Sequence, residues 1–373
     1  MQSARRRIVE CILRGTAVDG SEVKALDQTL EELTDSRTTG EMRHISTTSA
    51  DFPINIRDEI RGTQFDAFIS EFVKPRRAFA GRLRFLMGFV DSADTGIKPL
   101  LVTDWDGTMK DYCSQYATNL QPVYSAVVMG RFAELFTRAT AVLTAGPLRG
   151  PGILDLTALP INGPVMFSGS WGREWWLRGR RVVHDDGISE EGFDAIGRLS
   201  DEMTDLLANG VFSQFALVGS GVQRKVDRLT LGVQTVFGHV PLELVVRYIE
   251  AVKERIHRVD PNNTSLVLET SSPLEIEVCV HNSGAVWNKG DGVAALIESL
   301  HDTLKNGKVL VAGDTTSDLP MLQHAVSENR TVNSLRESVR SIVGDDSRIC
   351  FVSCPDVVHA AFARILAAKV ELD

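Results

Sequence analysis

The sequence predicts an α/β protein in which helices cover both faces of a parallel sheet. Three observations predict this fold class: strand and helix patterns alternate from Lys98 onward, an α+β segment interrupts the alternation, and the first part of the chain shows helical periodicity alone. We therefore expect a helical module at 1–95, an α/β core at 96–167 and 282–373, and an inserted α+β unit at 168–281.

The bulk composition is that of a globular protein with two or three domains. The chain has 373 residues, of which 43% are hydrophobic and 24% are charged. A net charge of −9 argues against a nucleic-acid-binding role, and no apolar run reaches the ~18 residues that a membrane helix needs. The five cysteines are scattered without metal-ligand spacing, and the N-terminus does not resemble a signal peptide, so we expect a cytoplasmic protein.

The N-terminal module shows helical spacing without any chemical motif. Val23, Leu26, Leu30 and Leu33 recur as on one helix face, and a second helical pattern runs over 56–72. Pro75 breaks that pattern, and a new apolar stripe follows over 79–90. We expect these helices to serve self-association or a protein partner.

The core shows five short apolar runs that read as strands, with helices between them. The expected strands are 99–103, 141–144, 165–167, 309–312 and 349–352, and the expected helices are 124–137, 290–304, 317–326 and 356–368. In such sheets ligands bind beyond the carboxyl ends of the strands. Chemistry is therefore expected just after Thr103, Thr144 and Ala312.

The insertion shows a different pattern of expected elements. Its expected strands are 215–218, 229–234, 266–268 and 274–280, and its expected helices are 190–207 and 242–258. An α+β lid over an α/β core accounts for this pattern.

The strongest motif is Asp104-Trp105-Asp106-Gly107-Thr108 at the end of an apolar strand. Phosphoryl transfer needs an in-line nucleophile, a nearby acid/base and a cation. Asp104 can attack phosphorus, and Asp106 can protonate the leaving oxygen and later accept a proton from water. An ordinary strand followed by an Asp-Gly turn is the alternative.

A second acidic pair, Asp314 and Asp318, follows the strand expected at 309–312. Mg²⁺ prefers oxygen ligands, and one or two carboxylates per element suffice for it. The alternative is a helix N-cap formed by Ser317 or Asp318 before Leu319. Either aspartate is a candidate for the direct metal ligand.

Two further candidates stand at element ends. Lys289 opens a helix, where its charge opposes the helix dipole unless an anion lies nearby. Thr144 offers a hydroxyl at a strand end that could bind a phosphoryl oxygen. A solvated loop lysine is the alternative for Lys289.

Taken in order, Asp-x-Asp-Gly-Thr, Thr144, Lys289 and Gly-Asp-x-x-x-Asp resemble the motifs of the haloacid dehalogenase superfamily over about 98–373. The resemblance implies a Rossmann-like core with an inserted cap, an aspartyl-phosphate route and bound Mg²⁺. It implies catalytic roles for Asp104, Asp106, Thr144 and Lys289, and a metal site formed by Asp104, Asp106, Asp314 and Asp318.

Within the insertion, Ser168 to Glu174 resembles the Gly-x-His/Asn-Gly-x-Glu segment of trehalose-6-phosphate phosphatases. Leu274 to Val278 followed by Asn288-Lys289-Gly290 is similar to a second segment of that family, and Val222 to Lys225 loosely matches its Glu-x-Lys. A helical N-terminal module is a feature of the nematode members. The resemblance implies that the substrate-binding residues are Arg173, Glu174, Lys225 and Glu275.

These motifs lead us to expect a Mg²⁺-dependent phosphatase acting on a small sugar phosphate, with trehalose 6-phosphate favoured. The alternatives are a phosphatase or phosphomutase for another sugar phosphate, and a catalytically idle scaffold that binds a partner. We expect neither nucleic acid nor a membrane as partner. Trp175 and Trp176 are expected to pack in the interior rather than to bind sugar.

Overall fold

The computed structural model describes residues 76–91, 96–111, 116–235, 240–269, 274–281, 287–301, 307–327, 331–334, 349–352 and 355–370. The helices predicted before residue 75 lie outside these ranges. Across the described ranges, no helix combines the length and the apolar character that crossing a membrane requires.

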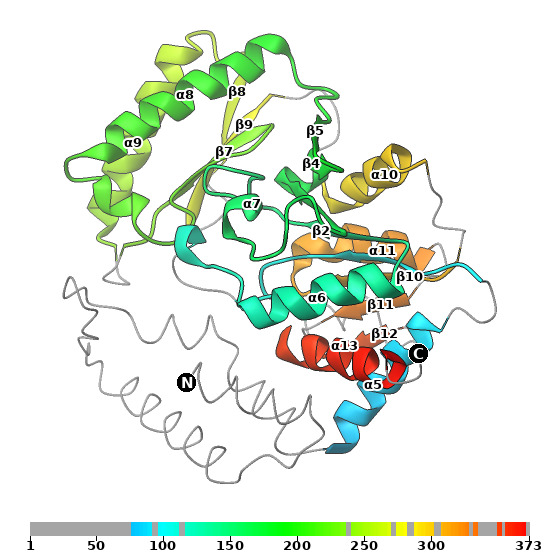
Figure 1. Ribbon diagram of the computed structural model, residues 1–373. Helices are drawn as coiled ribbons and strands as arrows, with labels where there is room; N and C mark the ends of the chain where they lie inside the picture. The colour runs from blue at the N-terminus through cyan, green and yellow to red at the C-terminus, as the bar shows by residue number, and fades with distance from the viewer. Residues whose placement is uncertain are drawn as a thin grey trace, which may run out of the picture.

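The larger sheet has eight strands in the order β12-β11-β10-β1-β2-β3-β4-β5 (Figure 1). The first six are parallel, and β4 and β5 extend the sheet as an antiparallel hairpin. The strands are β1 (Leu100–Thr103), β2 (Ala139–Leu143), β3 (Val165–Gly169), β4 (Glu174–Leu177), β5 (Arg180–Val183), β10 (Val309–Gly313), β11 (Thr331–Ser334) and β12 (Ile349–Phe351).

β1 lies at the switch point of the sheet. The chain passes from β1 through α6 (Val123–Phe136) to β2 on one side, and it returns much later at β10 on the other side. A switch point opens a crevice at the carboxyl ends of the two strands, which is where ligands bind in open α/β sheets. The end of β1 is therefore the expected place for the chemistry.

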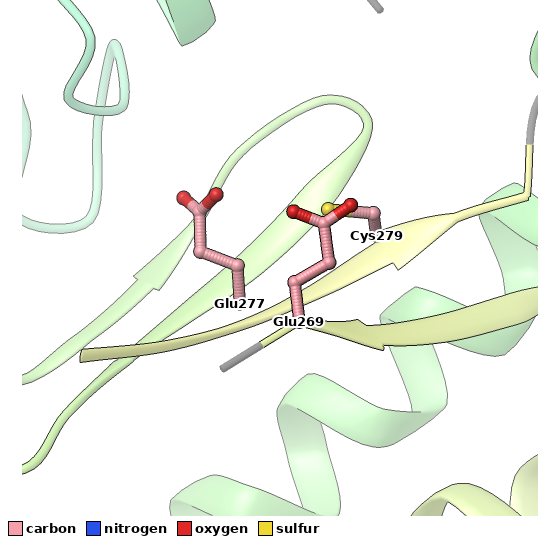
Figure 2. A group of neighbouring side chains, drawn as sticks. All are labelled: Glu269, Glu277 and Cys279. Atoms are coloured by element: carbon pink, nitrogen blue, oxygen red, sulfur yellow. The ribbon is translucent and has the colours of Figure 1, made fainter. Parts of the chain in front are cut away.

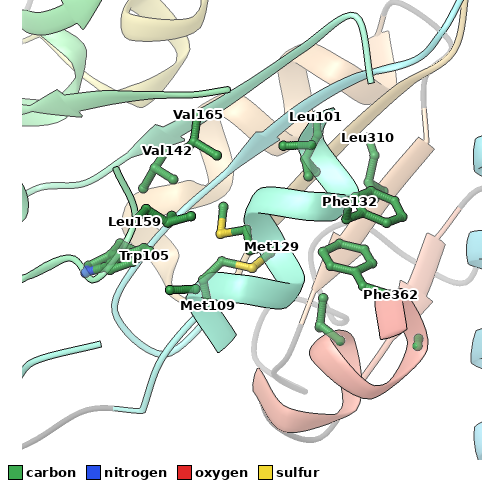
Figure 3. Close-up of a cluster of buried hydrophobic side chains, with 14 of the residues drawn as sticks. Leu101, Trp105, Met109, Met129, Phe132, Val142, Leu159, Val165, Leu310 and Phe362 are labelled. Atoms are coloured by element: carbon green, nitrogen blue, oxygen red, sulfur yellow. The ribbon is translucent and has the colours of Figure 1, made fainter. Parts of the chain in front are cut away.

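Alternate residues of β1 enter two different cores. Leu101 faces α6, α13 (Pro355–Val370) and the end of α5 (Arg76–Val90), where Phe132 stacks on Phe362 with ring centroids 3.9 Å apart (Figure 3). Leu100 and Val102 face the other way, toward α10 (Lys289–Ser299) and α11 (Leu319–Ser327). A strand buried on both faces requires the continuous apolar run that predicted it.

The insertion forms a second sheet, which is antiparallel with strand order β6-β7-β9-β8. Its elements are β6 (Val222–Arg224), β7 (Arg228–Gly232), β8 (Leu266–Glu269), β9 (Glu275–Val280), α8 (Glu190–Ala208) and α9 (Leu242–Val259). Ile276, Val278 and Val280 pack with α8 and α9 on one face of this sheet. Glu275, Glu277 and Cys279 must therefore lie on the opposite face, because successive side chains alternate along a strand.

The predicted fold class is confirmed: an α/β core carries a separate antiparallel sheet with two helices. One strand prediction is wrong. Residues 215–218 were expected to be extended, but Ser213–Ala216 forms the 3-10 helix η3, in which Phe215 packs 4.5 Å from the ring of Tyr248. A short apolar run does not distinguish a strand from a buried helical turn.

The structure contains a hairpin that was not predicted from the sequence. β4 and β5 join through Arg178 and Gly179, which both have positive φ (49° and 80°), as a tight hairpin turn requires. This hairpin lies within the expected inserted unit, yet it pairs with β3 of the larger sheet. The boundary expected at residue 95 is also crossed by contacts, because the end of α5 packs in the core through Leu86, Phe89 and Val90.

Candidate active site

Three buried aspartates meet at the carboxyl ends of β1 and β10. Asp104 follows β1, and its backbone N–H donates to the Ala312 carbonyl at 2.8 Å, which fixes it beside β10. Carboxylate oxygens of Asp104, Asp314 and Asp318 lie within 4.8 Å of one another. Such a group of oxygen donors can hold a divalent cation.

Thr108 connects two of these carboxylates. Its hydroxyl lies 2.9 Å from Asp104 Oδ2 and 3.3 Å from Asp314 Oδ1. A hydroxyl has one proton to donate, so it can bond to only one of the two carboxylates at a time, and the shorter distance favours Asp104. Thr108 belongs to the Asp-x-Asp-Gly-Thr motif, and its contact with both aspartates was not predicted from the sequence.

Asp318 has most of its hydrogen-bonding capacity occupied by the protein. Its Oδ2 accepts from the backbone N–H groups of Asp314 (2.9 Å) and Thr315 (2.8 Å) and from the Thr315 hydroxyl (2.9 Å). The arrangement is a capping box on the 3-10 helix η4 (Thr316–Asp318) with Thr315 as N-cap. The Asp318 side chain packs against the end of β10, which is possible only because Gly313 has no side chain. A Cβ at position 313 would lie 2.5 Å from Asp318 Cβ.

Lys289 supplies the positive charge of the cluster. Its Nζ donates to Asp104 Oδ1 at 2.6 Å and also to Asp318 Oδ1. The lysine is held at the first turn of α10 by a second capping box, in which Asn288 Oδ1 accepts from Gly290 N at 2.8 Å and Asp291 Oδ2 accepts from Asn288 N at 2.9 Å. The carboxylates thus compensate an ammonium group at a helix N-terminus.

The charges of the cluster do not balance. Burial, followed by the charge of Asp318, raises the pKa of Asp104 to about 7 against the opposing effect of Lys289. For Lys289, burial lowers the pKa, but the charges of Asp104 and Asp318 outweigh burial and raise it above its usual range. One ammonium group therefore faces three buried carboxylates, and a divalent cation would offset the surplus negative charge.

Asp106 lies outside this group. Its Oδ1 forms an ion pair with Lys110 Nζ at 2.6 Å, and its carboxylate is more exposed than that of Asp104. The Gly107 N–H donates to the Lys110 carbonyl at 2.7 Å and closes the turn that carries Asp106. Lys110 stands four residues after Asp106, so the spacing could have indicated this pair from the sequence.

Thr144 is buried at the end of β2, on the other side of β1 from β10. Its hydroxyl accepts from the Gly146 N–H at 3.2 Å, and its carbonyl accepts from the Trp171 N–H at 3.0 Å. The loop that follows β2 is thus tied to η2 (Ser170–Gly172), the segment between β3 and β4. The candidate catalytic residues carried by β1, β2, β10 and α10 all lie at the carboxyl ends of the parallel strands.

A close backbone contact joins η2 to the helix that carries Lys289. A Cβ at Gly172 would lie 2.4 Å from Gly292 Cα, and a Cβ at Gly292 would lie 2.5 Å from the Trp171 carbonyl oxygen. Both positions therefore require glycine. Ser170 and Trp171 themselves adopt positive φ of 55°, so the segment is held in a strained conformation next to the site.

The inserted unit presents a charged sheet face toward η2. Lys225 Nζ and the Arg228 guanidinium lie over the Trp171 ring, 4.1 and 4.2 Å from its centroid. Glu277 accepts from Arg228 Nη1 at 3.1 Å and lies 3.6 Å from Lys225 Nζ. Burial lowers the pKa of Lys225 to about 8, and the nearby charge of Glu277 opposes this shift.

Glu275 lies on the same sheet face and accepts a hydrogen bond from the Ser220 hydroxyl at 2.8 Å. Of the predicted substrate-binding residues, Lys225 and Glu275 share this face. Trp171, Arg228 and Glu277 join them and were not predicted. Trp171 stands where the related motif has His or Asn. That difference in the sequence could have indicated that this residue contacts the cap.

Glu174 and Arg173 are engaged in internal contacts. Glu174 Oε1 accepts from Leu148 N and Ser170 Oγ, both at 3.0 Å, and its Oε2 accepts from Arg181 Nη2 at 2.8 Å. Glu174 is buried, with an exposed fraction of 4%.

Arg173 is 2% exposed and spans the junction between the two units. Its Nη1 donates to the carbonyls of His184 (3.1 Å) and Asp186 (3.2 Å), and its Nε lies 3.3 Å from Asp227 Oδ2. Its guanidinium also lies 4.7 Å from the centroid of Trp287. These contacts line one side of a cavity of about 180 Å³ between the two units.

A second acidic cluster, Glu269, Glu277 and Cys279, lies on β8 and β9 (Figure 2). Burial raises the pKa of the Cys279 thiol to about 12, so the thiol stays protonated. The Arg228 guanidinium already binds Glu277 Oε2. A protonated thiol beside a guanidinium is a poor metal ligand, so this cluster is not a candidate metal centre.

The parallel sheet, the buried aspartates at its switch point and the lysine bonded to two of them define a phosphoryl-transfer enzyme of the haloacid dehalogenase type. Two family models match the chain: "Trehalose-6-phosphate phosphatase, C-terminal" over residues 101–358, and "Trehalose-6-phosphate phosphatase N-terminal helical bundle domain" over residues 1–80. The chain belongs to the trehalose-6-phosphate phosphatase family.

Its relatives include a trehalose-phosphatase of Caenorhabditis elegans, which is 59% identical over 98% of this chain and 93% of that protein. A trehalose-phosphatase of Brugia malayi is 53% identical over 98% of this chain and 84% of that protein. A crystal structure of a trehalose-6-phosphate phosphatase related protein superposes with a TM-score of 0.50 at 14% identity, covering 74% of this chain and 100% of that one. That likeness supports the fold.

Proposed function

We propose that this protein is a Mg²⁺-dependent phosphatase that hydrolyses trehalose 6-phosphate to trehalose and inorganic phosphate. The observation that carries the proposal is the bond from Lys289 Nζ to Asp104 Oδ1 at the end of β1, in a chain of this family. A carboxylate held at a strand end by a buried ammonium is oriented as a nucleophile.

Asp104 attacks phosphorus, and the bond between phosphorus and the sugar oxygen breaks as the aspartyl-phosphate forms. Asp106, which is outside the buried cluster and close to solvent, donates a proton to the departing sugar oxygen. It then takes a proton from the water that attacks the aspartyl-phosphate, which releases phosphate and restores Asp104. Lys289 and Thr144 hold the phosphoryl oxygens during both steps.

Asp104 and Asp314 are the residues that would hold Mg²⁺ directly. Asp318 is the weaker candidate, because its oxygens already accept three bonds from 314–315 and a fourth from Lys289. When bound, the cation offsets the negative charge that gathers on the phosphoryl oxygens. Asp106 was also expected as a ligand, but it lies outside the group of three aspartates and its Oδ1 is paired with Lys110.

The inserted unit acts as the cap that recognises the sugar. Lys225 and Glu275 donate to and accept from its hydroxyls on the charged sheet face, and Arg173 and Glu174 support that face through their contacts at the junction. In this division the cap is 168–281, the catalytic core is 96–167 and 282–373, and 1–95 is the N-terminal module, with the β4–β5 hairpin and the end of α5 attached to the core.

A phosphate-release assay tests the proposal. Trehalose 6-phosphate should release phosphate with Mg²⁺ present and should stop doing so in a chelator. Glucose 6-phosphate, which lacks the second ring, should be a poorer substrate. An isomerised sugar phosphate in place of free phosphate would indicate a mutase, and no turnover of any sugar phosphate would indicate an idle scaffold.

A further inference from the structure

Tyr116 places a phenol at the edge of the catalytic cluster. It opens the 3-10 helix η1 (Tyr116–Thr118) between β1 and α6. Its hydroxyl rests on the backbone of the loop after β2, since a Cβ at Gly146 would lie 2.3 Å from Tyr116 Oη. The Gly146 N–H donates to the Thr144 hydroxyl, so the phenol adjoins the loop that is proposed to hold the phosphoryl group.

This hydroxyl is buried and has no hydrogen-bond partner within the part of the chain that the structure describes. A buried hydroxyl without a partner costs free energy, so native structures rarely keep one without a reason. A ligand group that arrives with the substrate would provide the missing partner.

The surroundings keep the phenol in its neutral form, so it can donate a hydrogen bond to a ligand. Burial, followed by the charges of Asp106, Asp155 and Asp104, raises the pKa of Tyr116 well above its usual value. The phenol therefore keeps its proton and is available as a donor. The reactive oxygens of a phosphate ester accept hydrogen bonds, so donor and ligand are complementary.

The position of Tyr116 depends on the core and on the cap. Its side chain rests on Gly146 of the core, while its backbone N–H donates to the Gly219 carbonyl of the cap at 3.3 Å. The hydroxyl is thus held in place when the cap lies over the core.

We propose that Tyr116 is a further catalytic residue that donates a hydrogen bond from Oη to a phosphoryl oxygen of the bound substrate. This inference rests on the proposed function. The contact is to the phosphoryl group rather than to the sugar, because Oη rests on Gly146, whose N–H donates to the Thr144 hydroxyl, whereas the charged cap face lies on β7 and β9.

The test replaces Tyr116 by Phe in the full chain, which removes only the hydroxyl. We expect kcat/KM to fall about 10- to 100-fold for trehalose 6-phosphate and for p-nitrophenyl phosphate alike, because both carry the phosphoryl group. Binding of orthovanadate, measured by calorimetry, should weaken by a similar factor. The thermal midpoint should stay the same or rise, since the hydroxyl has no partner to lose.

Tyr124→Phe is the matched control. The Tyr124 hydroxyl donates to Asp356 Oδ1 at 2.5 Å and so joins α6 to α13, and its removal should lower the thermal midpoint and leave kcat/KM unchanged. For Tyr116→Phe, unchanged kinetics would overturn the inference. So would a loss confined to trehalose 6-phosphate, which would indicate a sugar contact, or a loss that accompanies a lower midpoint.

A wild-type protein that hydrolyses neither substrate would contradict the proposed function instead. Orthovanadate affinity would still decide the contact in that case. Equal affinity of the wild type and Tyr116→Phe would overturn it, and weaker binding by the variant would support it.

Discussion

Lys289 and Asp104 are 185 residues apart in the chain, yet Lys289 Nζ lies 2.6 Å from Asp104 Oδ1 in the buried cluster. Between these two residues the chain leaves the core after β3, forms the inserted unit and returns to the core before α10. Folding of the core therefore brings together a nucleophile and an ammonium group that the insertion separates in sequence.

Asp104→Asn should reduce turnover by ~10³-fold or more, because the amide keeps the size of the carboxylate and lacks its nucleophilic charge. Steady-state phosphate release measures the loss, and circular dichroism checks the fold. Asp201→Asn on the exposed face of α8 is the control and should keep full turnover. Turnover near that of the wild type in Asp104→Asn would refute the mechanism.

Asp314→Ala and Asp318→Ala should respond differently to added Mg²⁺. Loss of Asp314 removes a cation ligand, so excess Mg²⁺ should restore part of the activity. Loss of Asp318 leaves the amides of 314 and 315 without their acceptor, which costs about 1–3 kcal/mol of unfolding free energy, and it also releases Lys289. Mg²⁺ should not restore that variant, and equal rescue of both variants would contradict the assignment.

Lys225→Ala should lower kcat/KM for trehalose 6-phosphate by ~10²-fold, because sugar contacts help to position the reacting group. Hydrolysis of p-nitrophenyl phosphate should barely change, since that ester does not reach the cap face. Lys253→Ala, which removes an exposed ion pair with Glu250 on α9, is the control and should affect neither substrate. Equal losses on both substrates would show that Lys225 supports the fold instead.

The pH profile should carry the signature of Lys225, whose pKa is lowered to about 8 by burial. As the pH rises through about 8 the ammonium loses its charge, so kcat/KM for trehalose 6-phosphate should fall and Lys225→Met should lack that fall. Unfolded lysine titrates near ~10.4, so between these values the native state binds fewer protons and this group makes the free energy of unfolding rise with pH. Profiles that superpose for wild type and variant would exclude this role.

Gly292→Ala should destabilise the protein by about 1–3 kcal/mol, since the new Cβ would lie 2.5 Å from the Trp171 carbonyl oxygen and force the backbone apart. Urea unfolding measures the change. Gly197→Ala provides the matched control in α8, where a Cβ meets nothing within 4 Å, so this variant should gain up to ~1 kcal/mol. A neutral result at Gly292 would show that α10 and η2 can separate freely.

The central residues of the site could be predicted from the sequence because they stand at strand ends. β1 and β10 are apolar runs followed at once by acidic residues, so both the strands and the meeting of Asp104 with Asp314 follow from periodicity and the geometry of parallel sheets. The capping alternative named the wrong N-cap: Thr315 is the N-cap of η4, and Asp318 is the third residue of its capping box while it also binds Lys289.

The missed features depend on contacts between distant segments. Tyr116 has an ordinary sequence context, and only the fold places it against Gly146. The β4–β5 hairpin pairs with β3 although its composition suggested part of the insertion. Arg173 read as a substrate ligand from its motif, but its partners at 184, 186 and 227 are known only once the two units are assembled.

The position of Trp171 has an optical consequence. Trp171 belongs to η2, which connects β3 to β4 of the larger sheet, whereas the two cations over its ring, Lys225 and Arg228, come from the β6–β7 hairpin of the second sheet. Indole emission depends on the charges close to the ring, so separation of the two sheets would change the fluorescence of this tryptophan. The protein thereby contains its own spectroscopic reporter of cap position, and opening and closing can be followed during turnover without an attached dye.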